Sequence, residues 1–147
     1  MNLTYSEMTV DNIGEVLGFY IDYYNNVEES CWTEETAGKR IHQVLTIEDS
    51  YSLILRDDDK AVGFVMGYFK QYDDIVGYTL EEIVVSREYQ GKGLGSELLA
   101  EVEKRVHEKG AFCVELQAVN DEMHEHYYGK AGYGDAANFV MKNKWFD

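Results

Sequence analysis

The N-terminal third of the chain shows apolar residues at helical spacing. An edge strand is expected over Leu3–Met8, followed by a helix that starts near Asp11. The apolar positions of that helix share one buried stripe: Ile13, Val16, Leu17, Tyr20 and Tyr24. A second helix is expected to begin at Thr33, a good N-cap. Its apolar side comprises Ala37, Ile41 and Val44 or Leu45.

The period then changes from that of a helix to that of a strand. Tyr51–Leu55, Ala61–Lys70 and Val76–Val85 are predicted to be three strands. The segments Asp57–Asp59 and Asp73–Asp74 separate them, and aspartate favours turns. This part of the chain is therefore predicted to be an antiparallel meander.

The remaining segments alternate between helix and strand. An amphipathic helix, ending near Gly110, is marked by Leu94, Leu98, Leu99, Val102 and Val106. A strand carrying Phe112, Val114 and Leu116 follows, then a short helix around Asp121–Lys130. Phe139–Trp145 is expected to be a final strand. Together the segments predict an α/β fold with a mixed central β-sheet: an antiparallel N-terminal meander, then strand, helix, strand, helix, strand.

Length and composition indicate a single domain. The chain has 147 residues, no proline and no Gly/Ser-rich linker, so we expect one domain over residues 1–147. No apolar stretch approaches the roughly 18 residues that cross a bilayer. Cys31 and Cys113 belong to no Cys-x-x-Cys pair. We therefore expect a cytoplasmic protein with reduced thiols.

The chain is strongly acidic, with a net charge of −15 from 13 basic and 28 acidic residues. A field of this sign repels nucleic acid and anionic membranes, so neither is expected as a partner. It attracts a cationic small molecule or a basic peptide. Plain solubility is the alternative role of the charge.

A glycine-rich turn joins the last meander strand to the long helix. Its glycines let backbone amides point outward unobstructed, at a helix N-terminus that favours an anion, and Lys92 adds a cation. The turn is predicted to bind a phosphate group rather than only to connect two elements. The residues assigned to it are Gln90, Gly91, Lys92, Gly93, Leu94, Gly95 and Ser96.

Two familiar phosphate loops are excluded for this turn. A Walker loop needs glycine where Ser86 stands, five residues before the Gly91-Lys92 pair. The dinucleotide fingerprint needs glycine at position 96, which is serine.

Gln90-x-x-Gly93-x-Gly95 instead resembles the pyrophosphate-binding motif of the GNAT acetyltransferases, Gln/Arg-x-x-Gly-x-Gly/Ala. The resemblance runs from about Ala61 to Tyr133. It implies a GNAT-like acyl-CoA N-acyltransferase fold, acetyl-CoA as co-substrate, transfer of the acetyl group to an amine, and a homodimer. A non-catalytic acyl-CoA-binding sensor is the alternative function.

The strand before the turn breaks the alternation expected of a strand. Ile83 and Val85 face one side, but Leu80, three residues before Ile83, falls on the other. An extra residue at Glu81 or Glu82, which is a β-bulge, restores the parity. Alternatively, Leu80 faces a helix on the other side of the sheet.

The resemblance assigns the end of this strand to the pantetheine arm of the cofactor, through Ile83, Val84 and Val85. A backbone amide there is expected to polarise the thioester carbonyl.

Transfer to an alkyl amine needs a base, because an amine with a pKa near 10.4 is mostly protonated at neutral pH. Glu81 and Glu82 adjoin the expected pantetheine site, and Glu82 is the preferred base, directly or through water. The alternative is that both are ordinary solvated carboxylates. No base is apparent beside either cysteine, so direct attack by the amine in a ternary complex is expected.

A second GNAT motif resembles Asn120…Tyr127-Tyr128…Gly132-Tyr133. Carried over by position, Tyr128 donates a proton to the CoA sulfur and Asn120 binds the cofactor arm. A small residue usually stands where this chain has His124. By itself a Tyr-Tyr pair favours packing over catalysis.

Acidic and aromatic residues are frequent in the first two helices and the loop between them, where this family usually holds its acceptor. Tyr24, Glu28 and Trp32 are the residues expected to bind a cationic amine, by charge pairing and cation–π contact. The alternative is a solvated acidic face over an aromatic stripe. No metal site is expected, because His124 and His126 diverge on a helix and have no third ligand.

Overall fold

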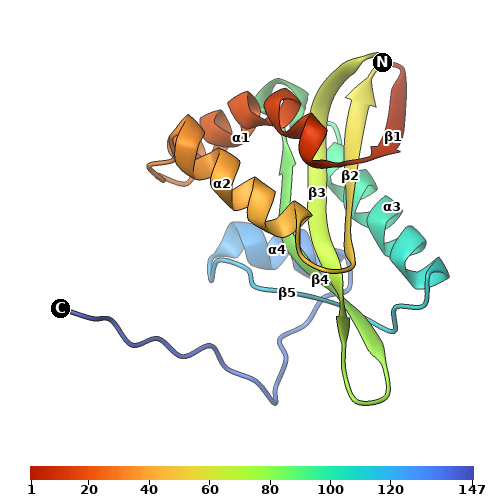
Figure 1. Cartoon of the computed structure of the whole chain (residues 1–147), viewed down its shortest axis with the longest axis vertical. Coiled ribbons are helices and arrows are strands. Elements are labelled where there is room, and N and C mark those ends of the chain that lie inside the picture. The colour runs from red at the N-terminus through yellow and green to blue at the C-terminus, as the bar shows by residue number, and fades with distance from the viewer. The chain divides into compact units, whose positions relative to one another are not determined.

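Five strands form a mixed sheet in the order β1-β2-β3-β4-β5 in the computed structural model of the chain (Figure 1). Their bounds are β1 Leu3–Glu7, β2 Ser50–Asp57, β3 Lys60–Gln71, β4 Val76–Val85 and β5 Val114–Leu116. The first four run antiparallel, and β5 runs parallel to β4. This is the mixed α/β sheet that the sequence predicts.

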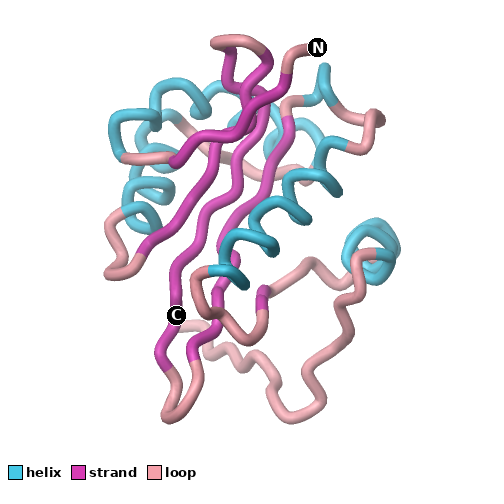
Figure 2. The backbone as a smooth tube through the Cα atoms, turned by 90° about the vertical axis from the view of Figure 1, so that its right-hand side faces the viewer, coloured by secondary structure: helices cyan, strands magenta, loops and turns pink.

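Helices cover both faces of this sheet. Their bounds are α1 Ile13–Val27, α2 Glu34–Leu45, α3 Leu94–Glu108 and α4 Glu122–Lys130. Helices α1 and α2 lie on one face, and α3 crosses the other (Figures 1 and 2). Short 3₁₀ turns at Val10–Asn12 and Arg87–Tyr89 precede α1 and the glycine turn. No helix combines the length and the apolar character that a membrane crossing requires.

The described residues, 1–147, fall into two units, Met1–Gln117 and Ala118–Asp147. The first contains the sheet and helices α1 to α3, and the second contains α4 and the C-terminal stretch. The single domain expected from the sequence stays a prediction.

Side-chain caps mark the start of α2 and of the 3₁₀ turn that precedes α1. Thr33 caps α2 as predicted: its hydroxyl accepts from the Thr36 amide at 3.1 Å, and its own amide donates to the Thr36 hydroxyl at 3.0 Å. Helix α1 begins at Ile13, slightly later than expected, because Thr9 and Asn12 cap the preceding 3₁₀ turn.

The packing of side chains on the α3 face of the sheet requires glycine at position 67, on β3. The Tyr78 ring lies beside it, fully buried, with its hydroxyl donating to the Tyr51 carbonyl at 2.7 Å. A Cβ on residue 67 would lie 2.2 Å from the Thr79 carbonyl oxygen and 2.7 Å from the Tyr78 hydroxyl. Only glycine leaves room for this ring.

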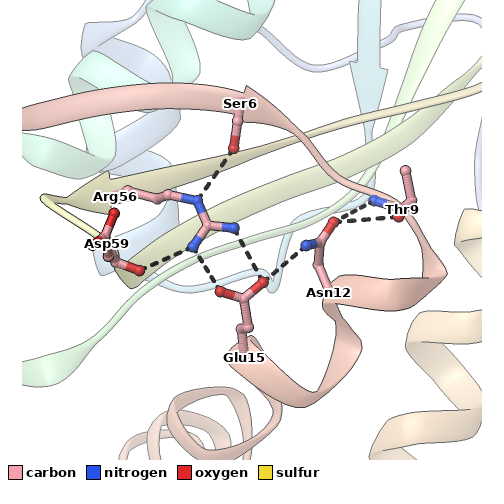
Figure 3. A network of polar contacts seen from close by, with 6 residues as sticks. All are labelled: Ser6, Thr9, Asn12, Glu15, Arg56 and Asp59. Atoms are coloured by element: carbon pink, nitrogen blue, oxygen red, sulfur yellow. Dashed lines mark hydrogen bonds and ion pairs between the residues drawn. The ribbon is translucent and has the colours of Figure 1, made fainter.

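Arg56 links the β2–β3 hairpin to the start of α1 (Figure 3). Its guanidinium donates to both carboxylate oxygens of Glu15, at 2.6 and 3.1 Å, and to the Asp59 carbonyl at 3.2 Å. The Asn12 side chain donates to the same carboxylate at 2.8 Å. These hydrogen bonds, those of Arg56 first, lower the pKa of Glu15 to about 2.

The prediction of a final strand over Phe139–Trp145 is wrong. These residues form no strand, and Phe139 and Trp145 are 70% and 86% exposed. A stretch rich in apolar residues suggests a strand, but a strand also needs a neighbour to satisfy its backbone groups, and no strand pairs with this stretch. Strand β5 is also shorter than expected. Phe112, which was expected to lie in this strand, lies outside it and is 77% exposed.

Candidate functional site

Two glycines shape the turn before α3. Gly91 and Gly93 have φ angles of +76° and +79°, a left-handed conformation that favours glycine. Gly93 is the N-cap of α3, and the Glu97 amide donates the bond to its carbonyl, at 3.1 Å. A Cβ on either glycine would meet no atom within 4 Å, so the space beside the turn is open. The turn therefore fits an anion at a helix N-terminus.

Side chains tie this turn to its surroundings. Gln90 donates from its side-chain amide to the Val85 carbonyl at 2.8 Å, so this predicted cofactor residue closes the turn onto the end of β4. Tyr89 donates to the Asp57 carboxylate at 2.8 Å. The ammonium groups of Lys60 and Lys92 lie 5.5 and 5.2 Å from the centre of the Tyr89 ring. Lys92 thus brings a positive charge to the turn, whereas Lys60 pairs with the Glu88 carboxylate at 2.5 Å.

A β-bulge precedes the turn, which is one of the two explanations that the sequence offers for the broken alternation. Met66 pairs with Glu82, whereas Gly67, the next residue, pairs with Leu80. Glu81 is therefore the extra residue, and Leu80 returns to the same side of the sheet as Ile83.

Past the bulge, one edge of β4 has no neighbouring strand. Strand β5 pairs with β4 only over Tyr78–Leu80. The Ser86 amide donates to the Val62 carbonyl on the β3 side at 2.8 Å. Alternation of the backbone then turns the main-chain groups of Ile83 and Val85 away from β3, and Val84 toward it. This edge can accept an extended ligand.

Helices α1 and α2 bring three donors to Glu82, beside the bulge. The Tyr20 hydroxyl donates to its carboxylate at 3.3 Å, and the Tyr24 hydroxyl donates to it as well. The Arg40 guanidinium lies 3.5 Å from it. The Glu82 side chain is only 14% exposed. The sequence predicted Glu81 and Glu82 at this place, and the structure puts Glu82 at the centre of the cluster.

Burial raises the pKa of Glu82, and the charge of Arg40 and the hydrogen bonds from Tyr24 and Tyr20 oppose the rise. Burial also raises the pKa of both tyrosines, and the charge of Glu82 adds to it. Both hydroxyls therefore stay protonated at neutral pH and donate to the carboxylate.

The residues expected to bind the acceptor lie at the end of α1 and in the loop that follows it. The Tyr20 ring centre is 4.8 Å from that of Tyr24 and 5.5 Å from that of Trp32, both edge-on. Asn25 holds the main chain of Trp32 at its amide and carbonyl, at 2.8 and 2.9 Å. Glu28 follows as the C-cap of α1, its amide bonded to the Tyr24 carbonyl. Tyr24 and Trp32 thus join the cluster at Glu82 through Tyr20.

Asn120 and Tyr128 belong to the second unit, Ala118–Asp147. The Tyr128 ring packs edge-on to Tyr127 at 4.8 Å and to Tyr133 at 5.7 Å. His124, where the family motif has a small residue, bonds to Asp121 at the N-cap of α4, 2.7 Å from ring nitrogen to carboxylate. Asn120 is exposed. Nowhere do three His, Cys, Asp or Glu side chains gather in a way that suits a metal ion.

Sequence reasoning missed two residues of the Glu82 cluster. Tyr20 belongs to the buried stripe of α1 and to the aromatic residues of the acceptor segment, but it was not among the residues expected to bind the acceptor, and Arg40 was assigned no role. One signal for Arg40 was present: a basic residue directly before Ile41, beside the apolar stripe of α2, in a chain with an excess of acidic residues.

Both the sequence and the fold of the chain are similar to those of known proteins. The model of the "Acetyltransferase (GNAT) family" matches residues 14–133. A possible acetyltransferase from Clostridium difficile 630 has a similar structure, with a TM-score of 0.82, 14% identity and full coverage of both chains. A ribosomal-protein-alanine N-acetyltransferase from Brucella melitensis biovar Abortus 2308 has a TM-score of 0.73 and 17% identity, covering 98% of this chain and 99% of that one.

An aminoglycoside N-acetyltransferase in complex with CoA is also similar, with a TM-score of 0.74 and 16% identity, over 97% of this chain and 95% of that one. At such identities these three likenesses concern the fold. No curated protein matches the sequence.

Proposed function

The chain belongs to the GNAT family of acetyltransferases, and on that premise we propose that it acetylates the primary amine of a cationic small molecule or peptide. The amine attacks directly in a ternary complex. GNAT acetyltransferases use acetyl-CoA, which is therefore the co-substrate and supplies the activated acetyl group as a thioester.

The glycine turn is the proposed site for the diphosphate. Its left-handed glycines, open flank and position at the N-terminus of α3 support this assignment. Lys92 adds a positive charge beside the turn. The residues proposed to hold the diphosphate remain Gln90 to Ser96, with Gln90 acting through its bond to Val85. Asn120 is proposed to bind the cofactor arm.

The open edge of β4 is the proposed site for the pantetheine arm. Ile83 and Val85 turn their main-chain groups to that edge, and the Val85 carbonyl already accepts from Gln90. The backbone amide proposed to polarise the thioester carbonyl is therefore that of Ile83 or that of Val85. Val84, which the resemblance also assigns to the pantetheine arm, is included because it lies between Ile83 and Val85 in the chain.

The position of Glu82 is the main observation that supports the proposed acetyl transfer. Glu82 is a largely buried carboxylate with a raised pKa, and it directly precedes Ile83 in the chain. A raised pKa makes a carboxylate a better base near neutral pH. As the nitrogen–carbon bond forms and the carbon–sulfur bond breaks, Glu82 takes the proton from the amine, directly or through water, and Tyr128 gives one to the sulfur.

A cationic acceptor suits the charge of the protein. The net charge is −15, and acidic and aromatic residues are frequent around Tyr24, Glu28 and Trp32. Two structural neighbours are named for a ribosomal-protein alanine and for an aminoglycoside. Both cysteines are free, which supports the expected cytoplasmic location, and a homodimer remains an expectation from the resemblance.

An acceptor screen tests this function. The protein is mixed with acetyl-CoA, a thiol reagent and three amines: spermidine, kanamycin and a basic peptide with a free N-terminus. Release of free CoA with at least one amine is expected, and Glu82→Gln should lower kcat by roughly a hundredfold. If the protein binds CoA but no amine releases a thiol, it is an acyl-CoA sensor instead.

A further inference from the structure

We propose that Arg40 is the positioning residue of this reaction: its guanidinium clamps the β4 bulge and holds the carboxylate of Glu82 toward the reacting amine. The inference rests on the proposed function, in which Glu82 takes the proton of the amine. Arg40 lies on helix α2, outside β4 and outside the cofactor motifs, and the proposed function gives it no role.

The guanidinium makes three contacts with two adjacent residues of the bulge. One nitrogen lies 3.5 Å from the Glu82 carboxylate, and the same nitrogen lies 3.4 Å from the Glu81 carbonyl oxygen. The other terminal nitrogen lies 3.6 Å from the Glu81 carboxylate. A bulge takes its extra residue out of the ladder, and here Arg40 supplies a donor to the carbonyl of that residue.

The backbone of Arg40 is held in place by its own helix. Ala37, Ile41 and Val44 of α2 are fully buried against the sheet, and Thr33 caps the start of the helix. Arg40 stands on the flank of this buried stripe, with its side chain 29% exposed. The helix therefore fixes the backbone position from which the Arg40 side chain reaches the bulge.

Arg40 supplies the positive charge among the groups that face Glu82. Helix α1 contributes the neutral hydroxyls of Tyr20 and Tyr24, β4 contributes the carboxylate of Glu81, and β3 opposes Glu82 with Met66. Burial favours protonated Glu82, and the charge of Arg40 is the largest effect that opposes it.

The distances from the Arg40 guanidinium to its partners leave Glu82 able to act as a base. At 3.4 to 3.6 Å the guanidinium stabilises negative charge electrostatically without a short bond that would occupy the carboxylate. The charge of Arg40 thus favours the ionised form of Glu82, the form that accepts a proton. Without Arg40, the pKa of Glu82 rises, and the acid side of the pH–rate profile moves to higher pH.

Two readouts test this role in the full chain. The first is kcat/KM from about pH 5.5 to 9, with the best amine of the screen. The second is a ¹³C NMR titration of the side-chain carboxyl groups, in which the Glu82 signal is identified by its absence in Glu82→Gln. The second readout does not depend on activity.

Arg40→Met should raise the titration midpoint of Glu82 and lose several-fold more activity near pH 6 than near pH 8.5. Arg40→Lys, which keeps the charge but not the fork, should restore most of the titration midpoint and less of the rate. Arg56→Met is the matched control, because the Arg56 side chain is 20% exposed and that of Arg40 29%, but Arg56 pairs with Glu15, so both readouts for Glu82 should stay unchanged. Arg40→Gln serves if the methionine variant does not fold.

An unchanged Glu82 midpoint in the Arg40 variants overturns the proposal, even where Glu82→Gln is inactive and the proposed function stands. Full activity of Glu82→Gln overturns the assignment of the base and, with it, the role of Arg40 in the reaction. A shifted midpoint together with a shifted acid limb supports both.

Discussion

The side-chain amide of Gln90 donates to the main-chain carbonyl of Val85 at 2.8 Å, so one hydrogen bond joins the glycine turn to the strand that precedes it. Val85 lies on the open edge of β4, where we propose that the pantetheine arm binds. The turn and the edge are thus held at a fixed separation, and the first prediction follows from this bond.

Gln90→Ala should weaken CoA binding by roughly fivefold, because loss of a hydrogen bond worth ~1 kcal/mol loosens the turn. Isothermal titration calorimetry with CoA measures the change. Gln43→Ala, at an exposed position of α2, is the control and should bind as the unaltered protein does. An unchanged Kd for Gln90→Ala would show that the turn keeps its shape without the bond.

Gly93→Glu should abolish CoA binding, because it places bulk and negative charge where the diphosphate is proposed to lie. The substitution also strains a left-handed residue, with φ at +79°. Gly110→Ala separates the two effects: it strains another left-handed position, at φ +107°, beyond the C-terminal end of α3. It should lower stability by about 1 kcal/mol and leave CoA affinity unchanged. Retained micromolar binding by Gly93→Glu in calorimetry contradicts the site.

Gly67→Ala should destabilise the protein by on the order of 3 kcal/mol, because the new methyl group collides with the backbone of β4 and the Tyr78 ring. Urea denaturation followed by circular dichroism measures this. Gly18→Ala is the matched control: it lies in α1 with no atom near its Cβ position, and should stabilise by about 0.5 kcal/mol. Equal effects of the two substitutions would mean that β3 moves to accommodate the methyl group.

The Glu15–Arg56 ion pair should make stability depend on pH in the acid range. The pKa of Glu15 is lowered from 4.5 to about 2 by Arg56, so its contribution is complete above pH 4.5 and is lost as pH falls through about 2. Urea titrations should therefore show Glu15→Gln less stable than the unaltered protein at neutral pH, with the difference shrinking toward pH 2. A difference that stays constant would assign the effect to packing.

The sequence predicts most of the first unit because each local signal agrees with the final packing. The parity break between Leu80 and Ile83 could be resolved by one extra residue, and the structure assigns it to Glu81. Thr33 could be recognised as a cap because its side chain bonds within four residues of itself. Such features depend on neighbours in the chain.

The rest depends on contacts between residues far apart in sequence. Arg40 and Glu82 are 42 positions apart, and no periodicity in either segment indicates their contact. The segment Phe139–Trp145 is rich in apolar and aromatic residues, as strands often are, but pairing partners decide whether a strand forms.

Strand β5 pairs with β4 only over Tyr78–Leu80. This short pairing affects how quickly deuterium from solvent should replace the amide hydrogens of β4. Val84, which faces β3, is protected by the ladder, whereas Ile83 and Val85 point their hydrogens to the other side. In the free protein, fast and slow exchange should therefore alternate from one residue to the next. A cofactor arm that docks as an additional strand would slow the two fast positions and leave the slow one unchanged.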